Sequence, residues 1–228
     1  MREIVLDTET TGLSPETGDR VVEIGCVELY NHIPTGKTFQ TYLNPERSMD
    51  VGAQEIHGLT DDFLKNQPIF LKIADEFLSF IGESTLIIHN AEFDLSFMNS
   101  ELKRIGRENI EFERAIDTLS IARKKFPGAQ NSLDALCRRF DVDNSRRDLH
   151  GALLDSEILA EVYLELIGGK EPDLNLVNQK KGDGKKTTNT RRQTNKRDTP
   201  LKYGISQAEK EQHLKFMHNL KNPIWNKR

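Results

Sequence analysis

Four carboxylates and one histidine are spaced in a way that could serve chemistry rather than structure. The first pair lies in the stretch IVLDTETTGL, where Asp7 and Glu9 interrupt an otherwise apolar segment. Alternate residues of a β-strand point to the same side, about 7 Å apart from twice the rise per residue. Two like charges this close repel each other, so their burial is costly unless a cation lies between them. The pair alone does not establish a cation site, because an exposed strand end or a helix N-cap would also explain two nearby acids.

Two further stretches place acidic residues at the start of predicted helices. In HNAEFDLSFM, Asp94 falls in the first turn after an apolar strand, where the helix dipole alone would favour an acid. In HGALLDSEILAEVY, Asp155 stands in a strongly apolar helix, a costly place for an unpaired charge. His150 precedes it by five residues, at or just before the helix start, where a polar cap is the ordinary alternative.

This set of side chains suits metal-assisted hydrolysis of a phosphodiester. Strand ends and helix starts are where α/β folds place their sites. Oxygen-rich acidic clusters bind hard cations, Mg²⁺ or Mn²⁺, rather than zinc. Two such ions about 4 Å apart clamp both the attacking and the leaving oxygen of a phosphodiester. A histidine at the rim supplies a base near neutral pH that deprotonates the attacking water.

The elements that must position these residues predict a mixed α/β domain with three strands first. The predicted strands, rich in β-branched residues and bounded by turn formers, span 3–6, 21–29, 38–43 and 85–89. The predicted helices span 59–68, 69–81, 93–105 and 151–167. Residues 115–126 are predicted to run from a strand into a helix. Asp117 is interpreted as the N-cap of that helix rather than as a metal ligand.

Composition indicates a soluble globular protein with an acidic body and a basic tail. The 228 residues are 36% apolar and 30% charged, enough for one medium domain and an extension. Residues 177–228 hold 14 basic and 4 acidic residues, or +10, so the net charge of −4 leaves −14 for residues 1–176. We find neither a bilayer-length apolar run of ~20 residues nor a signal peptide. Cys26 and Cys137, far apart in apolar surroundings, indicate core packing and a reducing, cytoplasmic location.

The basic tail divides into a predicted linker and a predicted short helix. Residues 178–199 contain no aliphatic or aromatic side chain, so they cannot offset the entropy cost of ordering and are predicted to be flexible. A short helix is predicted to begin at a Ser206 cap, and Pro223 is predicted to end it. Apolar residues return only here, at Leu214, Phe216, Met217, Leu220, Ile224 and Trp225. Because so short a helix is marginal alone, its apolar residues predict docking onto a partner.

The three acidic motifs together resemble a known family. DTETTGL, HNAEFD and HGALLD are similar to the D-x-E, Asp and H-x₄-D motifs of the DEDD superfamily of 3′–5′ exonucleases, in its histidine subgroup. Residues 131–163 resemble the proofreading epsilon-subunit family of bacterial DNA polymerase III, and the likeness runs from about residue 3 to 169. The resemblance implies a ribonuclease H-like fold, a mixed five-stranded sheet flanked by helices, and two divalent metal ions.

The resemblance also implies a role for each motif residue. Asp7 would bridge both metal ions, while Glu9 and Asp155 would complete the ion that activates water. Asp94 would hold the second ion, partly through water, and His150 would be the general base. Asp7 and Glu9 would in addition contact the substrate.

Further substrate contacts follow from the same resemblance. Thr10, Thr11 and Leu13 would lie against the terminal nucleotide, with Leu13 wedged against a base. The segment EIHGLTDDF is similar to the family's I-H-G segment, so His57 would touch the terminal nucleotide. Five residues before that histidine, relatives often carry a Glu that approaches the nucleotide. That position is Gly52 here, so any contact would be through the backbone.

The implied activity is removal of mispaired nucleotides from the 3′ end of a DNA primer, with release of nucleoside monophosphates. An acidic body is a poor DNA binder by itself, because cations meeting phosphates supply most of the affinity. A tether to the polymerase alpha subunit through residues 205–225 would replace that affinity with a high effective concentration. The predicted division is therefore an exonuclease domain (1–170), a flexible basic linker (171–204) and a polymerase-docking tail (205–228).

Alternatives remain open for the tail and for the activity. The basic linker could bind nucleic acid directly. Residues 171–176, EPDLNL, faintly resemble the peptide by which replication proteins dock on the sliding clamp, or are an ordinary linker entrance. A small theta-like accessory subunit could bind the body. The rival activities are a stand-alone trimming nuclease for RNA or single-stranded DNA, which would not need the tail, and a catalytically silent adaptor, which the five intact motif residues disfavour.

Overall fold

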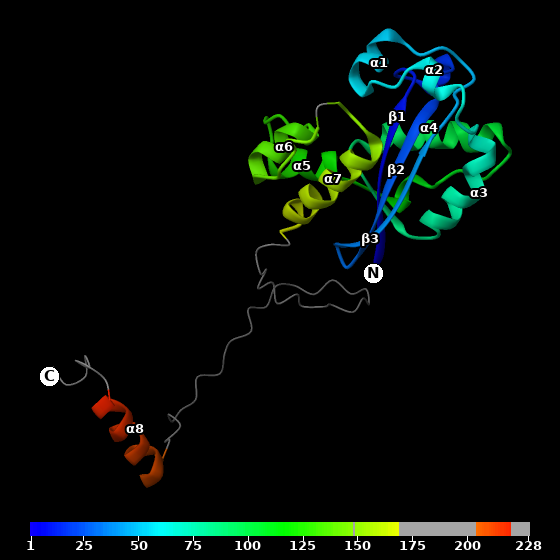
Figure 1. Ribbon diagram of the computed structural model, residues 1–228. Helices are drawn as coiled ribbons and strands as arrows, with labels where there is room; N and C mark the ends of the chain where they lie inside the picture. The colour runs from blue at the N-terminus through cyan, green and yellow to red at the C-terminus, as the bar shows by residue number, and fades with distance from the viewer. Residues whose placement is uncertain (148, 169–203, 220–228) are drawn as a thin grey trace, which may run out of the picture. The chain divides into compact units, whose positions relative to one another are not determined.

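The structure is a computed structural model that describes residues 1–147, 149–168 and 204–219 (Figure 1). The chain divides into two units, Met1–Leu176 and Val177–Arg228, and each is described by itself. The predicted flexible linker and the clamp-like segment within it lie outside the described residues. Among the described residues, no helix is long and apolar enough to cross a membrane.

Five strands of the first unit form one mixed sheet in the order β3-β2-β1-β4-β5, as the resemblance implied. The strands are β1 (Arg2–Thr10), β2 (Val21–Tyr30), β3 (Ile33–Tyr42), β4 (Thr85–Ile88) and β5 (Ala115–Asp117). The first three pair antiparallel, whereas β1, β4 and β5 run parallel to one another. The carboxyl ends of these parallel strands therefore meet at one edge of the sheet, the usual place for a site in such folds.

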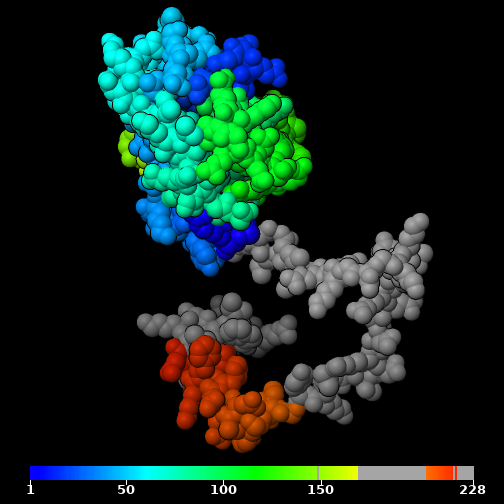
Figure 2. All heavy atoms as spheres, turned by 90° about the vertical axis from the view of Figure 1, so that its right-hand side faces the viewer, coloured from blue at the N-terminus to red at the C-terminus, as the bar shows by residue number. Residues whose placement is uncertain are grey.

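Helices pack on both faces of this sheet (Figure 1). They are α1 (Val51–His57), α2 (Asp61–Leu64), α3 (Phe70–Ile81), α4 (Ala91–Arg104), α5 (Thr118–Lys125), α6 (Leu133–Phe140) and α7 (Ala152–Leu166). Because side chains alternate along a strand, Ile4 and Leu6 of β1 pack with Phe77 of α3 in one core. Val5 between them packs with Leu159 of α7 in a second core. Figure 2 turns the face with α3 and α4 toward the viewer, coloured cyan to green.

Several elements differ from the sequence-based prediction. The helices α1 and α6 are additional, because each has only seven or eight residues, too short a stretch for a helical period to stand out in the sequence. The prediction of a helix over 59–68 is wrong in its length. The helix covers only Asp61–Leu64, and the Thr60 side chain caps its start. The following Asn-Gln-Pro sequence cannot continue a helix. Cys26 and Cys137 are free and buried, which agrees with the prediction of core packing.

The N-terminus of α7 is fastened onto β2. A Cβ atom on Gly25 would lie 2.2 Å from the backbone of Ala152, so only glycine allows this close approach. The Ala152 N–H donates to the Glu23 carboxylate at 3.2 Å, and the Ser156 hydroxyl donates to the Gly25 carbonyl at 3.0 Å. These contacts fix the first turn of α7, and with it Asp155, against the centre of the sheet.

The second unit contributes one described helix, α8 (Gln207–Asn219). The Ser206 hydroxyl accepts the Glu209 N–H at 3.3 Å, and the Glu209 carboxylate accepts the Ser206 N–H at 2.8 Å. This reciprocal capping box agrees with the predicted helix start. Leu214 and Phe216 are 61% and 60% exposed. The remaining residues of the predicted docking tail, Leu220, Pro223, Ile224 and Trp225, lie outside the described residues.

Candidate active site

One cleft of about 280 Å³ gathers all five motif residues at the carboxyl ends of β1 and β4. Its walls include Asp7, Glu9, Asp94, His150 and Asp155. The strand β1 supplies the first two, α4 supplies the third, and α7 with the loop before it supplies the rest. The strand continues to Thr10, beyond the predicted end at residue 6, so both of its carboxylates project from rigid paired backbone. The structure thus brings these residues together, and their roles stay a prediction.

Asp94 is held in the cleft by the turn between β4 and α4. Asn90 adopts the left-handed conformation (φ 75°) before the helix starts. The Thr8 hydroxyl of β1 donates to Asp94 Oδ1 at 2.7 Å. Asp117 accepts the Asn90 N–H and the Leu119 N–H, each at 3.0 Å. Asp117 therefore caps α5 and braces the turn, which agrees with its interpretation as an N-cap.

The carboxylates of the cleft carry more negative charge than their surroundings balance. Burial, followed by the charges of Asp94, Glu9 and Asp155, raises the pKa of Asp7 well above its usual range. Burial and the charge of Asp155 raise the pKa of Glu9 to about 8. Burial raises the pKa of Asp94 to about 7, although hydrogen bonds from Thr8 oppose it. Ionising all of them together therefore requires additional positive charge.

The donor set fits divalent metal ions. Ligand atoms of Glu9, His150 and Asp155 lie within 4.8 Å of one another. Asp7 and Asp94 line the same cleft and add further carboxylate oxygens. Oxygen-rich sets of this kind suit hard cations such as Mg²⁺ and Mn²⁺.

Arg147 is a cleft residue that the sequence analysis missed. Its Nε and Nη2 donate to the two oxygens of Asp155 at 2.5 and 2.7 Å. Its Nη1 donates to Asp134 at 2.7 Å, and its Nη2 lies 3.0 Å from Nδ1 of His150. One guanidinium thus partly balances Asp155 and orients the histidine ring. Its only sequence signal is its place three residues before His150, in a run that otherwise looks like an exposed charged loop.

His150 lies at the rim of the cleft. Its side chain is 45% exposed, and its Nδ1 is 3.6 Å from Asp155 Oδ2. Its backbone N–H donates to the Ile56 carbonyl at 3.1 Å, which fastens the loop to α1. Burial and the neighbouring Arg147 lower the pKa of His150. The ring is therefore neutral near pH 7 and able to accept a proton.

A second cavity of about 430 Å³ adjoins the cleft, and we call it the nucleotide cavity. Four residues predicted to contact the nucleotide line it: Thr10, Leu13, Gly52 and His57. Leu13 is 85% exposed at its mouth. A Cβ on Gly52 would meet nothing within 4 Å, so the cavity is open at this point. Asp50 and Phe93, which the sequence analysis did not single out, complete its polar and aromatic walls.

His57 and Thr11, both predicted to contact the nucleotide, differ in whether their side chains face this cavity. His57 is buried, its Nδ1 accepts the Leu59 N–H at 3.1 Å, and burial lowers its pKa. The Thr10 backbone lies near the ring, yet Nε2 makes no hydrogen bond of acceptable geometry among the described residues. Thr11, by contrast, is fully buried, and its hydroxyl lies 3.3 Å from Asp19. Thr11 therefore does not line the nucleotide cavity, and its predicted contact with the nucleotide stays a prediction.

Comparison with known proteins agrees with these motifs. The family model described as Exonuclease matches residues 4–163. The DNA polymerase III subunit epsilon of Rickettsia prowazekii (strain Madrid E) is 55% identical over 182 residues, which are 78% of this chain and 80% of that protein. The subunit of the same name from Escherichia coli (strain K12) is 50% identical over 176 residues, 74% of this chain and 72% of that protein.

Solved structures share the fold. The nuclease domain of 3′hExo, described as a DEDDh family member bound to rAMP, is 19% identical with a TM-score of 0.64. The match covers 74% of this chain and 92% of that one. Exonuclease X in complex with 5′ overhanging duplex DNA is 25% identical with a TM-score of 0.57, over 73% of this chain and 92% of that one.

Proposed function

The chain belongs to the exonuclease family and, through relatives similar over most of their length, to the DNA polymerase III epsilon subunits. On that premise we propose how it acts. It is a proofreading 3′–5′ exonuclease that hydrolyses the terminal phosphodiester of a DNA primer and releases nucleoside monophosphates. The observation that carries the proposal is the convergence of five motif residues in one cleft beside a nucleotide-sized cavity.

Two divalent ions, Mg²⁺ or Mn²⁺, fit the carboxylates of the cleft. In this proposal Asp7 would serve both ions, Glu9 and Asp155 would hold one, and Asp94 would hold the other. When bound, the ions supply the missing positive charge, acidify the attacking water and stabilise the leaving oxygen. The raised pKa values of the cleft carboxylates support this assignment, because such groups gain most from added cations.

The chain's own residues bind the end of the strand and move the proton. His150, neutral and half-exposed, is the general base: Arg147 Nη2 faces its Nδ1, so Nδ1 is the unprotonated nitrogen that takes the proton from water. Arg147 orients that ring and holds Asp155. The nucleotide cavity seats the terminal nucleoside, with Leu13 against the base and His57 beside it. A mispaired end reaches this cavity at lower cost, because it has fewer paired and stacked contacts to give up.

The predicted division into an exonuclease domain, a linker and a docking tail becomes part of the proposal. We infer that residues 205–225 anchor the enzyme on the polymerase alpha subunit, because Leu214 and Phe216 of α8 are exposed apolar side chains. The similar proteins from Rickettsia and Escherichia coli are named as subunits of DNA polymerase III, which supports such an assembly. A theta-like subunit and the sliding clamp remain further candidate partners.

The test is a primer-shortening assay. The purified protein with Mg²⁺ or Mn²⁺ should shorten a 3′-mismatched DNA primer, and the double variant Asp7→Ala/Glu9→Ala should abolish the activity. Asp62→Ala, which removes an exposed carboxylate outside the cleft, is the matched control. Unchanged activity in the double variant would contradict the site, and faster cleavage of an RNA strand would favour a trimming nuclease instead.

A further inference from the structure

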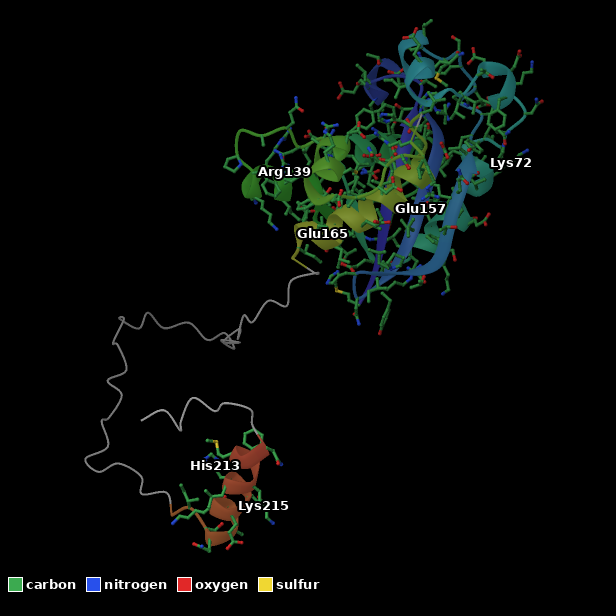
Figure 3. The ribbon with its side chains drawn as sticks, turned by 60° about the vertical axis from the view of Figure 1, so that its left-hand side comes forward. Lys72, Arg139, Glu157, Glu165, His213 and Lys215 are labelled. Carbon is green, nitrogen blue, oxygen red and sulfur yellow. The ribbon has the colours of Figure 1, made fainter. Side chains whose placement is uncertain are left out.

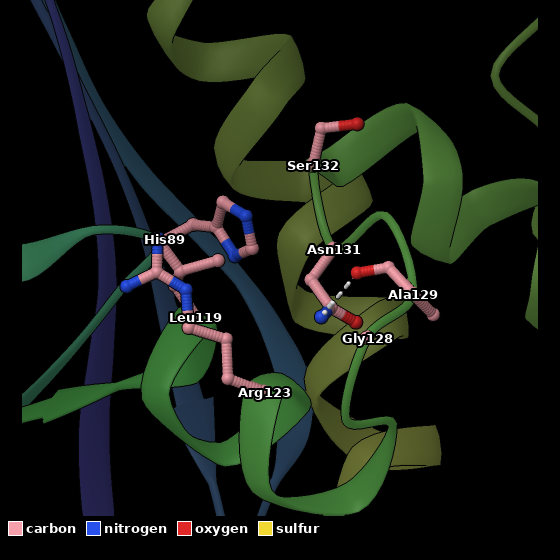
Figure 4. A pocket seen from close by; sticks show the side chains of 7 residues that line it. All are labelled: His89, Leu119, Arg123, Gly128, Ala129, Asn131 and Ser132. Atoms are coloured by element: carbon pink, nitrogen blue, oxygen red, sulfur yellow. Dashed lines mark hydrogen bonds between the residues drawn. The ribbon is translucent and has the colours of Figure 1, made fainter.

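A third cavity adjoins the cleft at walls that the nucleotide cavity does not share. The nucleotide cavity and the cleft share Thr8, Glu9 and Phe93 as common walls. The cleft in turn shares His89 and Ser132 with a cavity of about 590 Å³, shown in Figure 4. We call it the upstream cavity. Its walls come from the end of β4, from α5 and from the loop before α6, and it shares no lining residue with the nucleotide cavity, so the cleft connects the two.

We propose that the upstream cavity binds the DNA strand on the 5′ side of the scissile phosphate, and that Arg123 contacts a phosphate there. This inference rests on the proposed function. If the terminal nucleoside occupies the nucleotide cavity and the scissile phosphate occupies the cleft, the strand must leave the cleft on its other side. The shared walls at His89 and Ser132 make the upstream cavity the continuation of that path.

Arg123 is the cation available for such a contact. It lies in the last turn of α5, is exposed, and extends toward His89 (Figure 4). Among the residues that the structure describes, its guanidinium makes no hydrogen bond or ion pair, whereas Arg147 is already engaged by Asp155 and Asp134. Guanidinium groups bind phosphate through paired donors. In a body of net charge −14, an unpaired arginine beside the cleft supplies the local attraction that the phosphate backbone requires.

The walls of the upstream cavity are held in place before any ligand binds. The Asn131 side chain donates to the Ala129 carbonyl at 3.0 Å (Figure 4). Arg139, labelled in Figure 3, lies 4.3 Å from the centre of the Phe126 ring and donates to the Gln130 carbonyl at 3.2 Å. A cavity that is already shaped loses little conformational freedom when a strand enters it.

The loop is also tied to the cleft wall. Nδ1 of His89 lies 2.9 Å from the Thr118 hydroxyl, which fixes the ring shared by the two cavities. Ser132 caps α6 with its side chain, accepting the Ala135 N–H at 3.3 Å. Its hydroxyl hydrogen remains available to a phosphate oxygen at the same shared wall.

Substrate length separates this proposal from the rest of the mechanism. The p-nitrophenyl ester of thymidine 5′-monophosphate has no phosphate upstream of the bond that breaks, whereas a single-stranded DNA decamer does. We expect Arg123→Ala to raise KM for the decamer about tenfold with little change in kcat, the effect of losing one charged hydrogen bond. Cleavage of the ester should be unchanged. Decamer binding, followed by fluorescence anisotropy, should lose about one unit of salt slope.

Lys124→Ala is the matched control, because it removes the same charge from the same turn of α5 without lining the cavity. It should leave KM for the decamer close to that of the unmodified protein. Equal behaviour of Arg123→Ala and the unmodified protein on the decamer would overturn the upstream site and leave the proposed function intact. Equal loss on ester and decamer would also overturn it, because Arg123 would then act on the cleft itself. If the unmodified protein cleaves neither substrate, the proposed function fails, and this inference fails with it.

Discussion

Two buried arginine–carboxylate pairs in this protein have nearly the same geometry and different surroundings. Arg20 donates to the two oxygens of Glu101 at 2.5 and 2.8 Å, and Arg147 donates to those of Asp155 at 2.5 and 2.7 Å. The first pair joins the residue before β2 to α4, and the only further charge that pairs with Arg20 among the described residues is the exposed Glu46, 4.0 Å away. The second shares its cleft with several more carboxylates.

The difference separates a structural ion pair from a functional one. An intact buried ion pair adds little to the stability of the fold. Removing one of its partners is strongly destabilising, because the charge that remains is buried and unpaired. The Arg147 pair lies where Asp7 and Glu9 have raised pKa values, so one guanidinium does not balance the cleft. Excess negative charge costs stability and is what a cation site requires.

Neutralising the carboxylate of the Arg147 pair should lower activity and leave stability nearly unchanged, whereas neutralising that of the Arg20 pair should do the opposite. The largest expected effect is the loss of activity. Asp155→Asn should lower kcat/KM on a mismatched primer on the order of 10³-fold or more, since a metal ligand supplies several kcal/mol of transition-state stabilisation. Its free energy of unfolding should change by less than about 1 kcal/mol, because Asp134 still pairs with Arg147 at 2.7 Å and the loss of one carboxylate relieves repulsion in the cleft. Steady-state kinetics and urea unfolding measure both. A stable variant with normal kcat/KM would contradict the comparison.

Glu101→Gln should do the reverse. It removes the buried charge partner of Arg20 and leaves only the exposed Glu46, 4.0 Å away, so the free energy of unfolding should fall by about 3 kcal/mol. The protein that remains folded should keep its kcat, because Glu101 lies outside the cleft. Urea unfolding followed by circular dichroism measures the first quantity, and activity per folded molecule measures the second. A drop in kcat with unchanged stability would mean that this pair, too, serves the reaction.

The sequence predicted this cleft better than it predicted the elements around it. Asp7 and Glu9 were identifiable because a strand has a fixed two-residue period and charges inside it are rare. The role of Arg147 was not, because nothing local distinguishes it from Arg146 beside it. Only the packing of its loop against α7 brings it to Asp155.

The residues around the nucleotide cavity also show that local sequence alone does not predict which side chains face a site. Thr10 and Thr11 are adjacent and chemically identical, so motif resemblance assigned both to the substrate. The structure directs the Thr10 hydroxyl to the Gly12 carbonyl at 2.6 Å and leaves Thr11 fully buried. The short helices α1 and α6 were missed because seven or eight residues are too few for a helical period to stand out, although Leu133, Leu136 and Cys137 of α6 are buried together.

Stability against pH should show the excess charge of the cleft directly. The folded pKa values of Glu9, about 8, and Asp94, about 7, lie above those of an unfolded chain. The folded state therefore binds more protons, and stability falls as pH rises through these values. Without divalent metal, Tm should drop by about 4 °C or more from pH 6.5 to 8.5. His57, His89 and His150, whose pKa values are lowered by burial, partly oppose this fall near pH 6.5, because the unfolded chain still binds protons there that the folded chain does not.

The matched variant and the metal are the controls for this scan. Asp94→Asn removes one of the raised groups, so its Tm should fall less over the same interval. Saturating Mg²⁺ should also reduce the fall, because it stabilises the ionised carboxylates. A Tm that rises toward pH 8.5 in chelator would mean that the cleft is balanced, like the Arg20 pair.

The smallest expected effect concerns whether Arg147 competes with the metal ions for Asp155. If it does, Arg147→Gln should tighten Mn²⁺ binding about tenfold in isothermal titration, because the metal then no longer displaces the charged hydrogen bonds to both oxygens of Asp155. Arg146→Gln is the control: it removes the same charge one residue away, where the side chain is exposed and only 3.9 Å from Glu157. Weaker Mn²⁺ binding in Arg147→Gln would reverse the interpretation. The arginine would then organise Asp155 for the metal, and the two buried pairs would be more alike than their surroundings indicate.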